Sequence, residues 1–177
     1  MNSFTDEQLM ELFKTNKDGK GAIAFDHLYN RYSKRMVNFF YYSLWKDSEK
    51  AQDFLHDLFL KIIEQKEKFD TNQSFQAWIF RIASNMCKNE FRNIDVNKKY
   101  QTHIINTSDI IDKEQILNNE LQTYINSLEP EQRSLIVLRF KFNLTIKEIA
   151  SIFECPEGTI KSRLFYTTKE LSLKYKS

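Results

Sequence analysis

The chain has very few of the residues that make tight turns. Its 177 residues include only three glycines and two prolines. Hairpins, sandwiches and barrels need such residues at many turns, so their scarcity argues against a β-rich fold and favours an all-α one. Cysteine is also scarce. Cys87 and Cys155 fit no CxxC spacing, which predicts a reducing, cytosolic setting without structural disulfides.

Long apolar runs are missing too. The longest uncharged apolar-rich stretch, residues 36–45, is too short to cross a bilayer. The first residues lack the basic and apolar parts of a signal peptide. Hydrophobic residues make up 41% and charged residues 28%, which excludes a disordered chain and is ordinary for a globular one. The expected location is therefore cytoplasmic.

Charge is nearly balanced in total but unevenly distributed. The net charge is only +2. Residues 101–131 carry mostly acids, whereas residues 81–100 and 155–177 each carry a basic excess. Two basic patches separated by an acidic segment indicate two surfaces for an anionic partner.

Helical periodicity covers most of the sequence, after a capping-box pattern at Thr5 and Gln8. It fails over residues 96–111, which predicts a flexible linker between two small helical domains, residues 1–95 and 112–177. Further helices are expected at 22–44, 48–66, 75 into the nineties, 113–126, 130–141, 146–153 and 156–173. The expected core positions of the third and fourth helices are Phe54, Leu55, Leu58, Phe59, Ile62, Ile63, Trp78, Ile79, Ile82, Ala83 and Met86.

A helix-turn-helix is predicted near the C-terminus. Thr145 and Glu148 form a capping box, an apolar stripe runs to Phe153, and Pro156 restarts the helical pattern. The second helix should bury Ile160, Leu164 and Leu171. It should begin with Glu157 and Gly158, and the glycine removes side-chain bulk at the end of the helix that would meet a DNA groove. Its outward face presents donors suited to phosphates and base edges: Thr159, Lys161, Ser162, Arg163, Tyr166 and Lys169. The pattern alone also fits an αα-hairpin with a solvated basic face.

Residues 127–171 resemble the fourth conserved region of bacterial RNA polymerase sigma factors, most closely the extracytoplasmic-function (ECF) group of the sigma-70 family. The matching elements are Leu128-x-Pro130-x-x-Arg133, the triplet beginning at Glu148, and the run Gly158-Thr-Ile-Lys-Ser-Arg-Leu164. Glu154 departs from the pattern, because the family often has glycine at this turn.

An upstream segment carries the matching partner region. Residues 51–65 resemble the core-binding helix of the family, and residues 74–93 resemble its promoter-opening helix. His56-Asp57 replaces the usual Gln-Glu pair. The resemblance implies a face for core polymerase made of Asp53, His56, Asp57 and Lys61. It also implies contacts to the minus-ten element from Phe69, Asp70, Asn72, Arg81, Asn85, Lys88 and Arg92.

The residues themselves leave alternatives for both surfaces. Arg81, Asn85, Lys88 and Arg92 form one polar helical stripe that could follow a phosphate backbone, or be a solvated face. Asp53, His56 and Asp57 share one face and are metal-ligand types, but no second helix offers partners. A protein contact fits this face better.

The resemblance implies an all-α promoter-specificity subunit that is not an enzyme and needs no cofactor or metal. Its partners would be core RNA polymerase, through the clamp helices of the largest subunit and the flap of the second, and promoter DNA. An anti-sigma factor is a further candidate partner. The alternatives are a free-standing helix-turn-helix regulator and a metal-dependent hydrolase, for which the sequence offers no ligand set.

Overall fold

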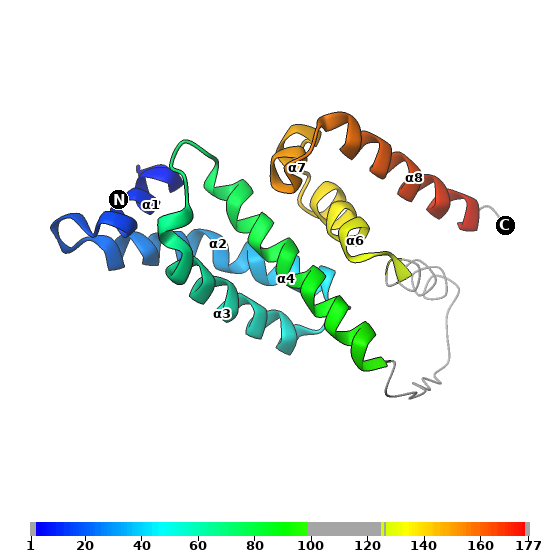
Figure 1. Ribbon diagram of the computed structural model, residues 1–177, viewed down its shortest axis with the longest axis horizontal. Helices are drawn as coiled ribbons and strands as arrows, with labels where there is room; N and C mark the ends of the chain where they lie inside the picture. Colours follow the sequence, from blue (N-terminus) through cyan, green and yellow to red (C-terminus); the bar gives the residue numbers. More distant parts are fainter. Residues whose placement is uncertain (1–2, 99–124, 126, 176–177) are drawn as a thin grey trace.

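The computed structural model describes residues 3–98, 125 and 127–175. Every regular element in those ranges is helical (Figure 1), which confirms the all-α class. The N-terminal domain contains α1 (Asp6–Thr15), α2 (Gly21–Ser43), α3 (Ser48–Gln65) and α4 (Phe75–Lys98), with one-turn 3₁₀ helices at Lys17–Gly19 and Lys66–Lys68. The C-terminal domain contains α6 (Pro130–Ile136), a π-helical turn at Val137–Lys141, α7 (Ile146–Phe153) and α8 (Glu157–Tyr175).

Two segments of the sequence prediction fall largely outside the described residues. The helix α4 continues to Lys98, past the predicted start of the linker at residue 96. The remainder of that linker and nearly all of the helix expected at 113–126 are not among the residues described.

The predicted capping boxes begin the helices expected of them. The Thr5 hydroxyl accepts a hydrogen bond from the Gln8 amide at 3.2 Å, and the Gln8 side chain accepts one from the Thr5 amide at 2.9 Å. Thr145 and Glu148 form the same pair at the start of α7. These bonds satisfy amides that a helix start otherwise leaves without partners, which explains why local sequence located both starts.

The N-terminal core forms between α2 and α3. Phe39, Phe40, Leu55 and Leu58 are all buried there. Ile63 is not, although periodicity placed it in the core: its side chain is 42% exposed. Around the helix axis it lies at the edge of the stripe formed by the buried residues of α3, which are Ala51, Leu55, Leu58, Phe59 and Ile62.

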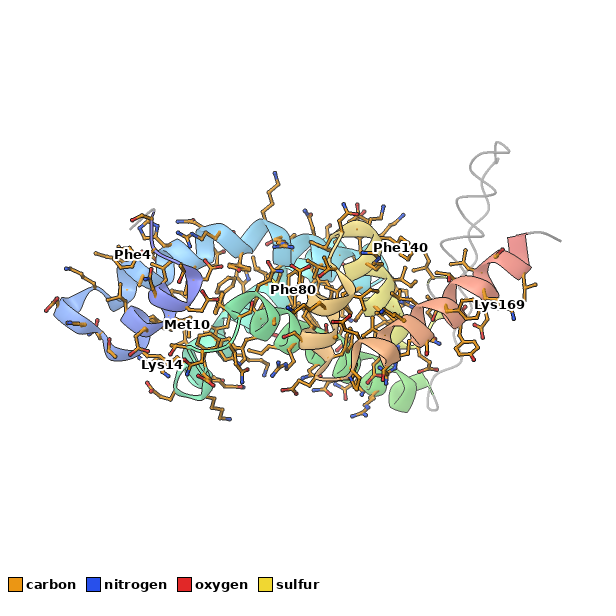
Figure 2. The ribbon with its side chains drawn as sticks, turned by 90° about the horizontal axis from the view of Figure 1, so that it is seen from above. Phe4, Met10, Lys14, Phe80, Phe140 and Lys169 are labelled. Atoms are coloured by element: carbon orange, nitrogen blue, oxygen red, sulfur yellow. The ribbon has the colours of Figure 1, made fainter. Side chains whose placement is uncertain are left out.

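The C-terminal domain packs on α4, which contacts both α6 and α7. Phe80 is fully buried, with its ring 5.4 Å from that of Phe39 and 5.6 Å from that of Phe142 (centroid distances), and Figure 2 shows it in the middle of the molecule. The expectation for α4 therefore needs correction. Ile79, Ala83 and Met86 are buried as predicted, but Trp78 and Ile82 are half-buried, and Phe80 takes a central place instead.

Arg133 joins the two domains through a buried cationic contact. Its side chain is 1% exposed, and its guanidinium lies 4.7 Å from the ring centre of Phe91 and 5.2 Å from that of Trp45. One nitrogen donates to the Ser43 carbonyl at 3.3 Å. Burial lowers the pKa of Arg133 to about 10, so the group remains charged at neutral pH.

Two further features follow from burial and composition. Burial raises the pKa of the Cys87 thiol to about 12, so this thiol stays protonated and unreactive at neutral pH. None of the helices within the described residues is both long enough and apolar enough to cross a membrane.

Candidate nucleic-acid and protein interfaces

The predicted helix-turn-helix is present, formed by α7 and α8. Glu154 ends α7 in the left-handed region (φ 50°, ψ 44°), and the Cys155 amide donates to the Ala150 carbonyl at 3.1 Å. The Pro156 carbonyl then accepts from the Thr159 amide at 2.9 Å as α8 begins. Ile149 and Ile160 are fully buried and hold the two helices together.

The left-handed conformation of Glu154 explains why the family pattern favours glycine here. A side chain at this backbone position costs roughly 1–2 kcal/mol. The Glu154 carboxylate also makes an ion pair with Arg81 of α4 at 2.5 Å. In this chain the turn residue therefore carries a contact between the domains that glycine could not make.

The outward face of α8 presents basic side chains and aromatic rings together. Lys161, Ser162, Arg163, Tyr166 and Lys169 are exposed, as are Glu157 and Gly158 at the start of the helix, whereas Thr159 is half-buried. A Cβ atom at Gly158 would meet nothing within 4 Å. Sequence reasoning missed Phe165, which is 58% exposed beside Tyr166 at 63%. Figure 2 shows Lys169 on the outside of α8. Cations interleaved with exposed rings are typical of nucleic-acid surfaces.

The predicted stripe on α4 divides into two parts. Asn85 and Arg92 are exposed, as expected. Arg81 and Lys88 are half-buried against the C-terminal domain. Besides its ion pair with Glu154, the Arg81 side chain donates to the carbonyls of Ser151 (3.0 Å) and Ile152 (3.3 Å). Helical spacing put these four residues on one stripe, but it could not show that part of the stripe meets α7.

Glu131 links the two basic surfaces. Its carboxylate pairs with Lys88 of α4 and lies 3.4 Å from Arg163 of α8. The hydrogen bond from Lys88 lowers the pKa of Glu131, with further lowering by the charges of Arg163 and Arg92. The paired carboxylate therefore remains charged at neutral pH, and its contribution is lost only when the pH falls through this lowered pKa.

The loop between α3 and α4 differs in one respect from the expectation. Phe69 is 1% exposed and packs on Phe75 and Trp78, so its ring is not available to stack on a base. Asp70 and Asn72 are exposed. The Asp70 carboxylate accepts hydrogen bonds from both the amide and the side chain of Asn72, each at 2.9 Å, which shapes the loop tip.

The predicted protein-binding face of α3 is open to solvent. Asp53, His56 and Asp57 are exposed, while Lys61 is half-buried. Leu60, on the same side of the helix, is 56% exposed, and sequence reasoning missed it. The acids of this face have the charge to attract a basic partner surface. Among the residues described, no group of three or more His, Cys, Asp and Glu side chains is placed to hold a metal ion.

Comparison with known families matches two segments of the chain in order. The family model "Sigma-70 region 2" matches residues 28–95, and "Sigma-70, region 4" matches residues 118–169. The chain is 28% identical over 177 residues to the ECF RNA polymerase sigma-E factor of Escherichia coli (strain K12), covering 90% of this chain and 91% of that protein. It is 26% identical over 138 residues to the ECF RNA polymerase sigma factor SigW of Bacillus subtilis (strain 168), covering 70% and 74%.

Two solved structures are similar in fold. CnrH, in complex with the cytosolic domain of CnrY, matches with a TM-score of 0.70 at 18% identity, over 97% of each chain. The sigma factor RpoE of Bartonella quintana, in complex with the anti-sigma factor NepR, matches with a TM-score of 0.64 at 22% identity. That match covers 86% of this chain and 96% of RpoE. Both likenesses concern the arrangement of the helices.

Proposed function

The chain belongs to the sigma-70 family of RNA polymerase sigma factors, within its ECF group, and we propose a division of promoter recognition between its two domains. The C-terminal helix α8 reads the minus-thirty-five element in the major groove. The α3–α4 loop and the exposed part of α4 engage the minus-ten element and its melted strand. The acidic face of α3 docks on core polymerase. The protein acts in the cytoplasm as a binding subunit and carries out no chemistry of its own.

The observation that carries this proposal is the exposed, basic and aromatic face of α8 on a well-formed helix-turn-helix. The side chains proposed to contact the duplex are Glu157, Thr159, Lys161, Ser162, Arg163, Tyr166 and Lys169, with Gly158 allowing close approach. A second exposed set, on α4 and its loop, supports the minus-ten role: Asp70, Asn72, Asn85 and Arg92. Phe69 is not part of the proposal, because its ring is buried.

Docking on core polymerase is assigned to the exposed acidic face of α3. Asp53, His56 and Asp57 provide charge and hydrogen-bonding groups, Leu60 adds exposed apolar area, and Lys61 borders the face. The proposed partner of this α3 face is the clamp helices of the largest polymerase subunit. The proposed partner of the C-terminal domain is the flap of the second subunit. An anti-sigma factor is also a proposed partner.

We expect the chain alone to bind promoter DNA poorly and to bind it specifically with core polymerase. The net charge is small, and phosphates would have to displace carboxylates from Arg81, Lys88 and Arg163. Co-purification with core polymerase, sequencing of the bound DNA and gel shifts with and without core would measure this. Tight, sequence-specific binding by the chain alone at physiological salt would instead support a free-standing regulator.

Substitutions on the two DNA-binding surfaces should impair different steps of initiation, closed-complex binding and strand opening. Arg163→Ala is expected to weaken closed-complex binding by about 1–3 kcal/mol if Arg163 reads a base, with little defect on a pre-melted promoter. Asn85→Ala with Arg92→Ala should leave closed binding largely intact and reduce strand opening, because their proposed ligand is the separated strand. Gel shift at low temperature reports the first step and permanganate reactivity of thymines the second. Equal damage to the same step by both sets would contradict the division.

A further inference from the structure

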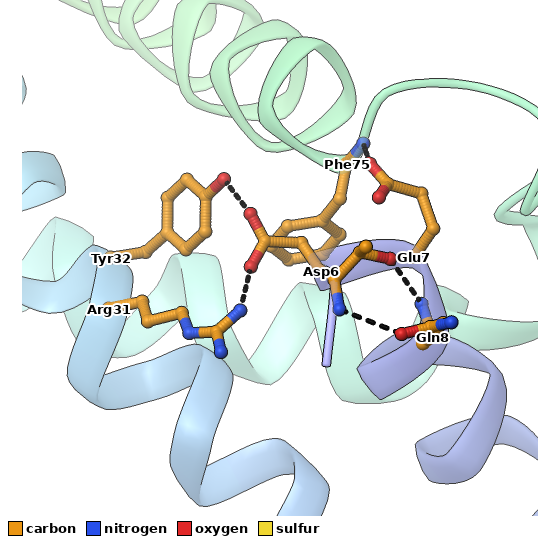
Figure 3. A network of polar contacts seen from close by, with 7 residues as sticks. Asp6, Glu7, Gln8, Arg31, Tyr32 and Phe75 are labelled. Carbon is orange, nitrogen blue, oxygen red and sulfur yellow. Dashed lines mark hydrogen bonds and ion pairs between the residues drawn. The ribbon is translucent and has the colours of Figure 1, made fainter. Parts of the chain in front are cut away.

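Helix α1 lies outside the matched region 2 segment, which begins at residue 28, yet it is firmly attached to that domain. Its own Leu9 and Met10 are fully buried. At its start, the Asp6 carboxylate accepts hydrogen bonds from Tyr32 at 2.5 Å and Arg31 at 2.6 Å, both from α2 (Figure 3). Burial is the main cause that raises the pKa of Tyr32, and the hydrogen bond to Asp6 is the second. The hydroxyl therefore remains protonated and acts as a donor. This anchoring gives α1 a fixed position on the domain.

From that position, two side chains of α1 reach the two ends of the α3–α4 loop. The Glu7 carboxylate accepts a hydrogen bond from the Phe75 amide, the first residue of α4, at 3.0 Å, as Figure 3 shows. The Lys14 ammonium donates to the Phe69 carbonyl at 2.8 Å. Just before the loop, the Lys66 ammonium lies 5.0 Å from the ring centre of Phe13. Each contact joins residues more than fifty positions apart in sequence.

The loop between these attachment points is short and presents its side chains outward. Its flanking residues Phe69 and Phe75 are buried at 1% and 0% exposure, with ring centres 5.8 Å apart. Between them, Asp70, Asn72, Gln73 and Ser74 are exposed. The Gln73 amide donates to the Asp70 carbonyl at 2.9 Å, which closes the turn. The loop is therefore bonded to α1 at both ends and closed by a turn of its own.

We propose that Glu7 and Lys14 are positioning residues that hold the α3–α4 loop in the conformation that reads the unstacked minus-ten base. The inference rests on the proposed function for the role of the loop. Glu7 and Lys14 need not touch DNA. They remove the entropy that a free loop would lose on binding, and so raise its affinity for the single strand.

The test compares variants of the full chain with matched controls on the same part of the molecule. Glu7→Leu removes the acceptor at Phe75, and Lys14→Met removes the ammonium while keeping the stem. Glu7→Gln keeps an acceptor oxygen in the same place and serves as the conservative rescue. The exposed residues Glu11 and Lys17 supply the controls Glu11→Leu and Lys17→Met.

Two measurements apply to each variant. Amide hydrogen exchange of the free chain reports the loop itself. Affinity of the core-bound chain is measured for a single-stranded oligonucleotide carrying the non-template minus-ten sequence of the promoter recovered with the polymerase. Duplex containing only the minus-thirty-five element is the second probe. Glu7→Leu and Lys14→Met should each speed exchange at residues 70–75 and weaken single-strand binding by roughly tenfold, the equivalent of one hydrogen bond.

In Glu7→Leu and Lys14→Met the affinity for the duplex should not change. Glu7→Gln should behave like the unaltered chain, and the controls Glu11→Leu and Lys17→Met should change neither exchange nor affinity. Unchanged exchange in Glu7→Leu and Lys14→Met would overturn the role of α1. Faster exchange with unchanged single-strand affinity would overturn the link between loop order and reading. If the unaltered complex fails to hold the single strand, the proposed minus-ten function falls, while exchange still decides whether α1 fixes the loop.

Discussion

Asp53→Lys with Asp57→Lys is expected to abolish binding of core RNA polymerase while leaving the fold intact. Both acids are exposed on α3, and no ion pair within the described residues involves either of them. If they face basic residues of the polymerase, reversal turns attraction into repulsion, which costs several kcal/mol across an interface. Exposed substitutions of this kind usually change the free energy of unfolding by less than about 0.5 kcal/mol.

Affinity for core would be measured by fluorescence anisotropy, and stability by circular dichroism on heating. The matched control is Glu11→Lys with Asp26→Lys, which makes the same change in net charge at exposed positions of α1 and α2. That control should retain core binding. A large loss of stability in the Asp53 and Asp57 variant would show that this pair supports the fold and is not an interface.

Arg133→Ala is expected to separate the two domains. The change leaves the buried Ser43 carbonyl without its donor, removes the cation that contacts both Trp45 and Phe91, and opens a void beside these rings. A desolvated cation–π contact and a lost buried hydrogen bond together suggest a cost of about 2–4 kcal/mol. Each domain has its own helical contacts, so helicity should remain while the contact between the domains weakens.

Small-angle scattering would report separation as a larger radius of gyration, and tryptophan fluorescence would report exposure of Trp45. Arg139→Ala is the control, because Arg139 lies on the same stretch of helix but donates to the Leu144 carbonyl within the C-terminal domain, at 2.9 Å. The control should keep the compact form. An unchanged radius of gyration in Arg133→Ala would mean that the other contacts between the domains, those of Phe80 with Phe142 and of Arg81 and Lys88 with the C-terminal domain, suffice to join them.

Local patterns predicted the helices and the helix-turn-helix because their causes are local. A capping box satisfies helix-start amides with side chains three residues away, and Pro156 acts on its immediate neighbours. Spacing along a single helix was also enough to predict exposure of Asp53, His56 and Asp57, and of Arg163 and its neighbours on α8. The assignment of these residues to polymerase or DNA came from family resemblance, and their roles stay proposals.

The predictions that needed correction concern residues whose surroundings come from distant segments. Phe69 looked like an exposed loop aromatic, but Phe75 and Trp78 cover it. Arg81 and Lys88 matched the helical spacing of Asn85 and Arg92. In the structure, however, Arg81 contacts α7 and Lys88 contacts Glu131 of α6, while Asn85 and Arg92 are exposed. Ile63 looked like a core position, but its side chain is 42% exposed.

The sequence alone therefore determined the all-α class, the helix starts, the turn before α8 and which face of each isolated helix is polar. These follow from hydrogen bonds and side-chain directions within a few residues. Only the tertiary structure decided that Arg133 contacts both Trp45 and Phe91, that Glu131 joins Lys88 to Arg163, and that Glu7 and Lys14 hydrogen-bond to the two ends of the α3–α4 loop. Each of these contacts joins segments more than thirty residues apart. Whether such segments meet depends on how whole helices pack, and periodicity along one helix carries no information about which partner covers its second face.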